Sequence, residues 1–215
     1  MTGCICVYLH GFLSSEHSQK GQWFKQNLPQ LIMTDTSKSS CQVLTPSYPM
    51  KNPDEAVQFL TEFLNQAGLF KSNQHWFLAG SSMGGFYAQY LAHKFNKPFI
   101  MINPALDPVS LFEEYAGEHC NQHTGETVYV DQAYRDALKK YYQPANQQNR
   151  TLLLLDEDDE VIPYQTAFER YQTDNPLHVT KVFEGGDHAF QHLDESAKDI
   201  KSFIEKAVLE RRNSI

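Results

Sequence analysis

The chain has 215 residues, of which 41% are hydrophobic and 20% charged, a composition typical of folded globular domains. Because one hydrophobic core can serve roughly 250 residues, we expect a single domain over residues 1–215. The formal charge of −8 argues against nucleic acid and anionic membranes as partners, because both attract basic proteins.

No export signal is visible in the N-terminal sequence. Residues 1–9 lack the positive charge that begins a secretory signal, and their apolar run is too short to cross a membrane. The cysteines are too sparse for the disulfide framework of a small secreted domain. We interpret all of them as buried free thiols: Cys4, Cys6, Cys41 and Cys120.

Short apolar runs alternate with amphipathic stretches along the chain, which is the pattern of parallel βαβ units. Several runs are apolar at nearly every position, as expected of strands covered by helices on both faces. We therefore predict an α/β fold with a mostly parallel, doubly wound sheet of about six strands. The predicted strands are Cys4–Leu9, Gln42–Thr45, Trp76–Ala79, Phe99–Ile102, Thr151–Leu155 and Val179–Phe183.

Two connecting stretches predict helices. Asn52-Pro53-Asp54-Glu55 offers an N-cap, a proline at the first helical position and a glutamate for a capping box. Apolar residues then repeat at helical spacing, and Gly68 is placed to end this helix. The last helix presents one apolar stripe, made of Ile200, Phe203, Ile204, Ala207 and Val208.

Residues 104–149 interrupt the regular alternation. The segment is long, rich in Tyr, His and Gln, and broken by Gly117, Gly125 and Pro144. Long excursions from a compact domain often form lids or binding loops. We expect a helical, lid-like insertion over the active site, with helices that simply pack on the sheet as the alternative.

The strongest motif is Gly80-Ser81-Ser82-Met83-Gly84, a G-x-S-x-G pattern between an apolar run and a helix-like stretch. In a nucleophile elbow the chain turns sharply from strand to helix, so the neighbours of the serine must be small. Gly80 and Gly84 meet this need, and Ser82 would stand at the positive end of the helix dipole. Ser82 is therefore the candidate nucleophile.

A second motif, His10-Gly11-Phe12, follows the first predicted strand. A loop at this place can aim the Phe12 N–H at a developing oxyanion, with the Met83 N–H as the second donor. His10 and Gly11 then shape the oxyanion loop. His10 as catalytic base is a weaker alternative, because the base follows the nucleophile in the chain order that accompanies G-x-S-x-G.

A glycine-marked loop, Gly185-Gly186-Asp187-His188, follows the last predicted strand. Functional groups gather beyond the carboxyl ends of parallel strands, so this loop should emerge beside Ser82. Imidazole titrates near neutral pH and can take the proton of a serine hydroxyl. We choose His188 as the general base, with His192 as the nearest alternative.

An acidic run, residues 156–160, follows the predicted strand Thr151–Leu155. One of its carboxylates should accept a hydrogen bond from the second ring nitrogen of the base and fix its tautomer. We choose Asp159, with Asp156 and Asp158 as alternatives. Metal binding by this run is a weaker interpretation, because the regular ligand alternation of a calcium loop is missing.

Taken together, these motifs resemble the YqiA-like esterases, a compact bacterial branch of the α/β-hydrolases. The matching stretches run in the same order through nearly the whole chain: residues 8–12, 14–15, 80–85, 103–105, 159–161 and 184–190. Similarity to this family places the acid before Glu160-Val161 and so supports Asp159. Many α/β-hydrolases have glycine three residues before the acid, whereas Asp156 stands there in this chain.

The resemblance implies the α/β-hydrolase fold and a cytoplasmic serine esterase with a Ser-His-Asp triad. Its substrates would be small acyl esters, with acyl-CoA thioesters as further candidates, and it would need neither a metal nor an organic cofactor. Two other function classes fit the same residues. An acyltransferase would pass the acyl group to an alcohol or amine, and a non-catalytic binding protein would keep the fold alone.

Overall fold

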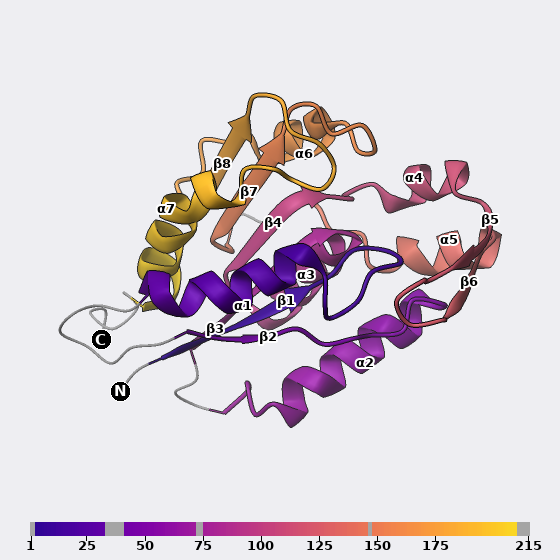
Figure 1. Cartoon of the computed structure of the whole chain (residues 1–215), viewed down its shortest axis with the longest axis horizontal. Helices are drawn as coiled ribbons and strands as arrows, with labels where there is room; N and C mark the ends of the chain where they lie inside the picture. The colour runs from indigo at the N-terminus through magenta and orange to yellow at the C-terminus, as the bar shows by residue number, and fades with distance from the viewer. Residues whose placement is uncertain (1–2, 33–40, 72–74, 146–147, 210–215) are drawn as a thin grey trace.

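A computed structural model describes residues 3–32, 41–71, 75–145 and 148–209. At its centre lies a parallel sheet with the strand order β2-β1-β3-β4-β7-β8 (Figure 1). The six strands are β1 (Cys4–Leu9), β2 (Cys41–Leu44), β3 (His75–Ser82), β4 (Phe99–Pro104), β7 (Thr151–Asp156) and β8 (His178–Phe183). The predicted parallel sheet is therefore confirmed.

The bounds of β1 agree with the prediction, whereas those of the other strands differ at their ends. The largest difference is in β3, which was expected to stop at Ala79 but continues to Ser82. It continues because the pairing with β4 extends through the elbow, where Ser82 lies opposite Pro104 after a register shift. The nucleophile motif therefore begins inside the sheet.

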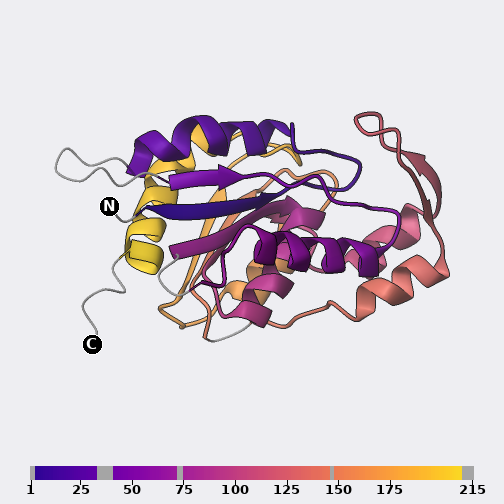
Figure 2. The ribbon, with the colours of Figure 1, turned by 90° about the horizontal axis from the view of Figure 1, so that it is seen from below.

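Helices cover both faces of the sheet, as Figures 1 and 2 show. Trp76 and Leu78 of β3 point into one core, and Phe77 and Ala79 point into the other, as the two-residue period of a strand requires. The first core is covered by α2 (Pro53–Gln66), α3 (Met83–Phe95) and α6 (Tyr164–Tyr171). The second is covered by α1 (Gln19–Ile32), α7 (Leu193–Ile204) and the π-helical turn η1 (Glu205–Leu209).

The predicted helix ends are present in α2. The Asn52 side chain accepts hydrogen bonds from the N–H groups of Asp54 and Glu55, at 2.7 and 3.4 Å. Gly68, with φ +70°, follows the last turn and ends the helix. Within the described ranges, no helix has both the length and the apolar character that a membrane span requires.

Residues 104–149 are only partly helical. Besides α4 (Pro108–Glu114) and α5 (Gln132–Lys139), they contain an antiparallel hairpin that the sequence did not predict, β5 (Gly117–Cys120) and β6 (Thr127–Val130). The expected start, Pro104, belongs to β4, and residues 146–147 lie outside the described residues. Figures 1 and 2 both place these elements at one end of the molecule.

The interpretation of the four cysteines as buried free thiols is wrong for three of them. Cys4 and Cys41 form a disulfide, because they are register partners on the adjacent strands β1 and β2, with Cα atoms 4.6 Å apart. Cys120 is free but exposed, at the end of β5. Cys6 is a buried free thiol, as predicted.

Replacing Asn52 by Ala should lower the free energy of unfolding by about 1 kcal/mol, because two backbone N–H groups lose their acceptor. Asn52→Gly should lose only about a few tenths of a kcal/mol, since glycine suits an N-cap backbone. Urea unfolding followed by circular dichroism measures both variants. Unchanged stability in both variants would show that the Asn52 side chain does not stabilise the helix.

Candidate active site

The strand order changes direction between β1 and β3. From β1 the chain proceeds to β2 at one edge of the sheet, whereas from β3 it proceeds toward β4, β7 and β8. The helices that follow β1 and β3 also lie on opposite faces. Loops that leave the carboxyl ends of two such strands diverge and leave a crevice between them. Ser82 and the predicted oxyanion loop both lie at this crevice.

Ser82 stands at a strained turn between β3 and α3, with φ 52° and ψ −126°. A residue with a side chain adopts this conformation at a cost of about 1–3 kcal/mol. A side chain at Gly80 would collide with the carbonyl oxygen of Gly84, and a side chain at Gly84 would collide with that of Leu9. Both glycines are therefore needed for the turn to form beside β1.

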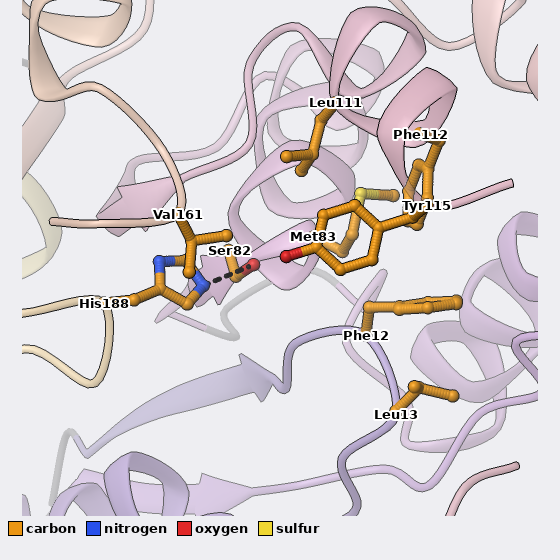
Figure 3. Close-up of a pocket in the computed structure, with 9 residues that line it drawn as sticks. All are labelled: Phe12, Leu13, Ser82, Met83, Leu111, Phe112, Tyr115, Val161 and His188. Carbon is orange, nitrogen blue, oxygen red and sulfur yellow. Dashed lines mark hydrogen bonds between the residues drawn. The ribbon is translucent and has the colours of Figure 1, made fainter. Parts of the chain in front are cut away.

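The structure brings Ser82, His188 and Asp159 into one hydrogen-bonded row. His188 Nε2 lies 3.1 Å from Ser82 Oγ (Figure 3), and His188 Nδ1 lies 2.9 Å from Asp159 Oδ2. Because Nδ1 faces a carboxylate, it carries the ring proton, which leaves Nε2 free to accept the serine proton. The residues chosen from the sequence therefore have the geometry of a nucleophile, a base and an orienting acid.

Asp159 is held in place by the turn that follows it. Its side chain is 1% exposed, and Oδ1 accepts hydrogen bonds from the N–H groups of Val161 and Ile162, at 2.9 and 2.8 Å. These bonds fix the direction of the carboxylate toward His188. The alternative Asp158 is exposed, so it does not take part in this row.

The other alternative acid, Asp156, forms a second and separate histidine pair. Its carboxylate lies 2.7 Å from His192 Nδ1 and accepts the backbone N–H groups of Gln191 and Asp187, at 2.8 and 3.2 Å. His192, the rival base, also stacks on Phe183. Asp156 and His192 therefore support the loop that carries His188, a role that sequence reasoning missed.

Three further side chains hold consecutive residues of this loop, 187–189. The Asn103 amide donates a hydrogen bond to the Asp187 carbonyl at 2.9 Å. The Glu160 carboxylate accepts a hydrogen bond from the His188 N–H at 2.9 Å. The Lys20 ammonium donates a hydrogen bond to the Ala189 carbonyl at 2.8 Å. Partial burial lowers the pKa of Lys20, and the neighbouring carboxylates oppose that shift. The loop is thus fixed from several elements of the fold.

The predicted oxyanion loop passes directly beside Ser82. A Cβ atom added to Gly11 would lie 3.3 Å from Ser82 Cβ, so a larger residue would press on the hydroxyl. The His10 ring is 2% exposed, stacks on Tyr48 at 4.4 Å, and lies with Nδ1 3.0 Å from the Gly11 carbonyl oxygen. These contacts shape the loop, whereas the hydroxyl of Ser82 is bonded to His188.

An apolar pocket of about 200 Å³ opens beside Ser82. Figure 3 shows its walls, with the Tyr115 hydroxyl directed toward Ser82. Part of the wall comes from α4, so segment 104–149 borders the site. The lining residues are Phe12, Leu13, Ser82, Met83, Leu111, Phe112, Tyr115, Val161 and His188.

The acidic run 156–160 does not gather into a metal site, because its buried members, Asp156 and Asp159, are bound to separate histidines. No group of three His, Cys, Asp or Glu side chains suited to a metal ion is found in the part of the chain that the structure describes.

Residues 5–205 match the UPF0227 family, described as an uncharacterised protein family. The chain belongs to the UPF0227 family. A UPF0227 protein from Serratia proteamaculans (strain 568) is 26% identical over 205 residues, which cover 93% of this chain and 98% of that protein. The resemblance to the YqiA-like branch is therefore confirmed.

Solved structures show that this UPF0227 protein has the α/β-hydrolase fold. Est1E from Butyrivibrio proteoclasticus is similar with a TM-score of 0.73 and 14% identity, over 96% of this chain and 89% of that chain. Another structure of Est1E has ferulic acid bound. Alpha/beta hydrolase domain-containing protein 10 from mouse has a TM-score of 0.70 and 15% identity, over 94% and 90% of the two chains. The predicted fold is confirmed.

The stability of the fold should depend on pH through His10. Burial lowers the pKa of His10 below its ordinary value of 6.5, so the folded protein keeps this ring neutral. As pH falls through about 6.5, the unfolded chain takes up a proton that the folded chain does not, and the free energy of unfolding should fall.

His10→Phe keeps a ring against Tyr48 but removes the titrating group, so its stability should fall less between about pH 8 and about pH 5. Urea unfolding of both proteins at the two pH values measures this difference. The same fall in both proteins would exclude His10 as its source.

Proposed function

We propose that this protein is a serine hydrolase that cleaves small carboxylic acyl esters. The observation that supports this most is the hydrogen-bonded row from Asp159 through His188 to Ser82 at a strained strand–helix turn. The similarity to solved structures of esterases and hydrolases agrees with it. In this proposal Ser82 is the nucleophile, His188 the general base and Asp159 the orienting acid.

In the first step, the Ser82 oxygen attacks the ester carbonyl carbon while His188 Nε2 takes the hydroxyl proton. The carbonyl π electrons move to oxygen, and the Asp159 carboxylate stabilises the imidazolium that forms. The oxyanion then collapses, the bond to the leaving alcohol breaks, and His188 gives its proton to the leaving oxygen. Ser82 is left as an acyl ester.

The second half of the reaction uses the same groups. A water molecule gives a proton to His188 and attacks the acyl carbon. Collapse of the second oxyanion then breaks the bond to Ser82 Oγ, which takes the proton back from His188, and the acid is released. Acyl-CoA thioesters would react in the same way, with sulfur as the leaving atom.

We assign the oxyanion site to the backbone N–H groups of Phe12 and Met83. Both residues line the pocket beside Ser82, and Met83 is the first residue of α3, so its N–H lies at the positive end of the helix. Preorganised donors of this kind stabilise charge that develops only in the transition state, and loss of one donor typically costs about 10²–10³ in rate.

Ser82→Ala should reduce the hydrolysis of p-nitrophenyl butyrate by about 10⁴-fold or more, because the acyl-enzyme cannot form. The release of p-nitrophenol by purified protein measures it. Ser81→Ala is the matched control: Ser81 is bonded to the Tyr8 hydroxyl at 2.9 Å and lies outside the row, so activity should persist. Unchanged turnover by Ser82→Ala would exclude this serine as the nucleophile.

Changing each of the three neighbouring aspartates to Asn should affect activity and stability differently. Asp159→Asn should lower kcat by about 10⁴-fold with little loss of stability, because His188 loses the carboxylate that sets its tautomer. Asp156→Asn should lower both activity and the thermal midpoint, because Asp156 is 0% exposed and supports the loop.

The exposed control, Asp158→Asn, should change neither quantity. Steady-state kinetics together with thermal unfolding separates the three variants. If Asp159→Asn keeps more activity than Asp158→Asn, the assignment of the acid is wrong.

A further inference from the structure

Two hollows of different chemistry meet at Ser82. One is the apolar pocket of about 200 Å³ described above. The other is a groove of about 480 Å³ that shares Ser82, His188 and Phe12 with the pocket. An ester bound at Ser82 has two parts, an acyl group and a leaving alcohol, so each hollow can receive one part.

Proton transfer decides which part lies in the groove. His188 has to give its proton to the leaving oxygen, so the leaving group must extend along the side where His188 stands. The groove is bordered by Ala189 and Glu160, the chain neighbour and the hydrogen-bond partner of His188. In Figure 3, Phe112 and Tyr115 of the pocket lie on the opposite side of Ser82. The pocket therefore suits the acyl group.

The volumes of the pocket and the groove agree with this assignment. Sites that bury drug-sized ligands usually measure about 300–1,000 Å³. The pocket lies below this range, so it accepts a short aliphatic or single-ring acyl group, whereas the groove lies within it. The leaving group can therefore be larger than the acyl group.

The groove is lined by polar side chains: His17, Ser18, Gln19, Lys20, His123 and Glu160. Its two fully charged groups are already engaged, Lys20 with the carbonyl of Ala189 and Glu160 with the N–H of His188. Gln19 and His123 are exposed, and no hydrogen bond joins either side chain to another described residue. One positive and one negative group balance in formal charge, and the other polar side chains of the groove offer neutral donors and acceptors.

The position of His123 is fixed by the hairpin turn. The Asn121 side chain, which is 1% exposed, accepts the N–H of His123 at 2.9 Å and donates to the Ser14 carbonyl at 2.9 Å. The turn is thereby fastened to the loop that follows β1. His123 and Gln19 consequently border the groove from two separate elements.

We propose that the groove recognises a neutral, hydroxyl-rich alcohol, so that the substrates are polyol or sugar esters of short or single-ring acids. This inference rests on the hydrolase function proposed above and names its substrate class. CoA fits less well, because its phosphates would meet the Glu160 carboxylate, and Lys20 is the single lysine or arginine among the described residues that line the groove.

The test compares esters of one acid, so that only the leaving group changes. We expect kcat/KM for 1-butyrylglycerol to exceed that for methyl butyrate by about tenfold, because each hydrogen bond to a hydroxyl contributes roughly threefold to tenfold. S-butyryl-N-acetylcysteamine and butyryl-CoA, which differ in the phosphates, should be hydrolysed with similar kcat/KM.

Gln19→Leu and His123→Leu should each lower the ratio of glycerol ester to methyl ester by about threefold or more. Gln122→Leu is the matched control on the same turn, because Gln122 does not line the groove, and its ratio should stay that of the unmodified protein.

Any one of three results would overturn the assignment of the groove. They are equal kcat/KM for 1-butyrylglycerol and methyl butyrate, a preference for butyryl-CoA over S-butyryl-N-acetylcysteamine, and unchanged ester ratios in both Gln19→Leu and His123→Leu. A failure of the hydrolase proposal itself would give another result. In that case the unmodified protein would hydrolyse none of these compounds faster than the Ser82→Ala variant does.

Discussion

The backbone of α3 approaches the ends of β1 and β3 so closely that no side chain fits at Gly80 or Gly84. This contact forces the turn at Ser82 into its strained conformation and places the hydroxyl at the first turn of α3. It also brings the end of β1 against the turn, so the predicted oxyanion loop and Ser82 line the same pocket. The remaining groups of the site are arranged around this contact.

The second support of the site is a set of buried polar side chains at the ends of β4 and β7. Asn103 joins the Asp156 N–H at 2.9 Å to the carbonyl of Asp187. Asp156 in turn holds further N–H groups of the loop after β8. Because a buried polar group without a partner costs about 1–3 kcal/mol, these bonds favour one position of the loop and hence of His188.

Features with local causes could be predicted from the sequence. The elbow shows as a motif within residues 80–84, and the six strands show as apolar runs because helices cover them on both faces. The placement of His188 beside Ser82 followed from the rule that loops gather at the carboxyl ends of parallel strands. The choice of Asp159 over Asp156 and Asp158 depended largely on the support of a family resemblance, because the three are neighbours in the chain.

Features that depend on register could not be predicted. The disulfide of Cys4 with Cys41 requires that β1 and β2 align at these residues. Asp156 and His192 pair across two elements of the fold. No sequence pattern distinguishes them from other combinations of an acid and a histidine in the chain. The hairpin was missed because Gly117–Cys120 is a polar strand whose side chains show little alternation between apolar and polar.

The fastening of segment 104–149 bears on how a substrate can reach Ser82. Besides the bond from Asn121 to the loop after β1, Glu126 accepts the N–H of Met50 at 2.9 Å, and Lys140 forms an ion pair with Asp54 at 2.7 Å. Swinging the whole segment outward would break all three attachments together. A substrate can reach Ser82 without breaking any of these attachments, because the groove and the pocket both extend to Ser82 while the segment is in place.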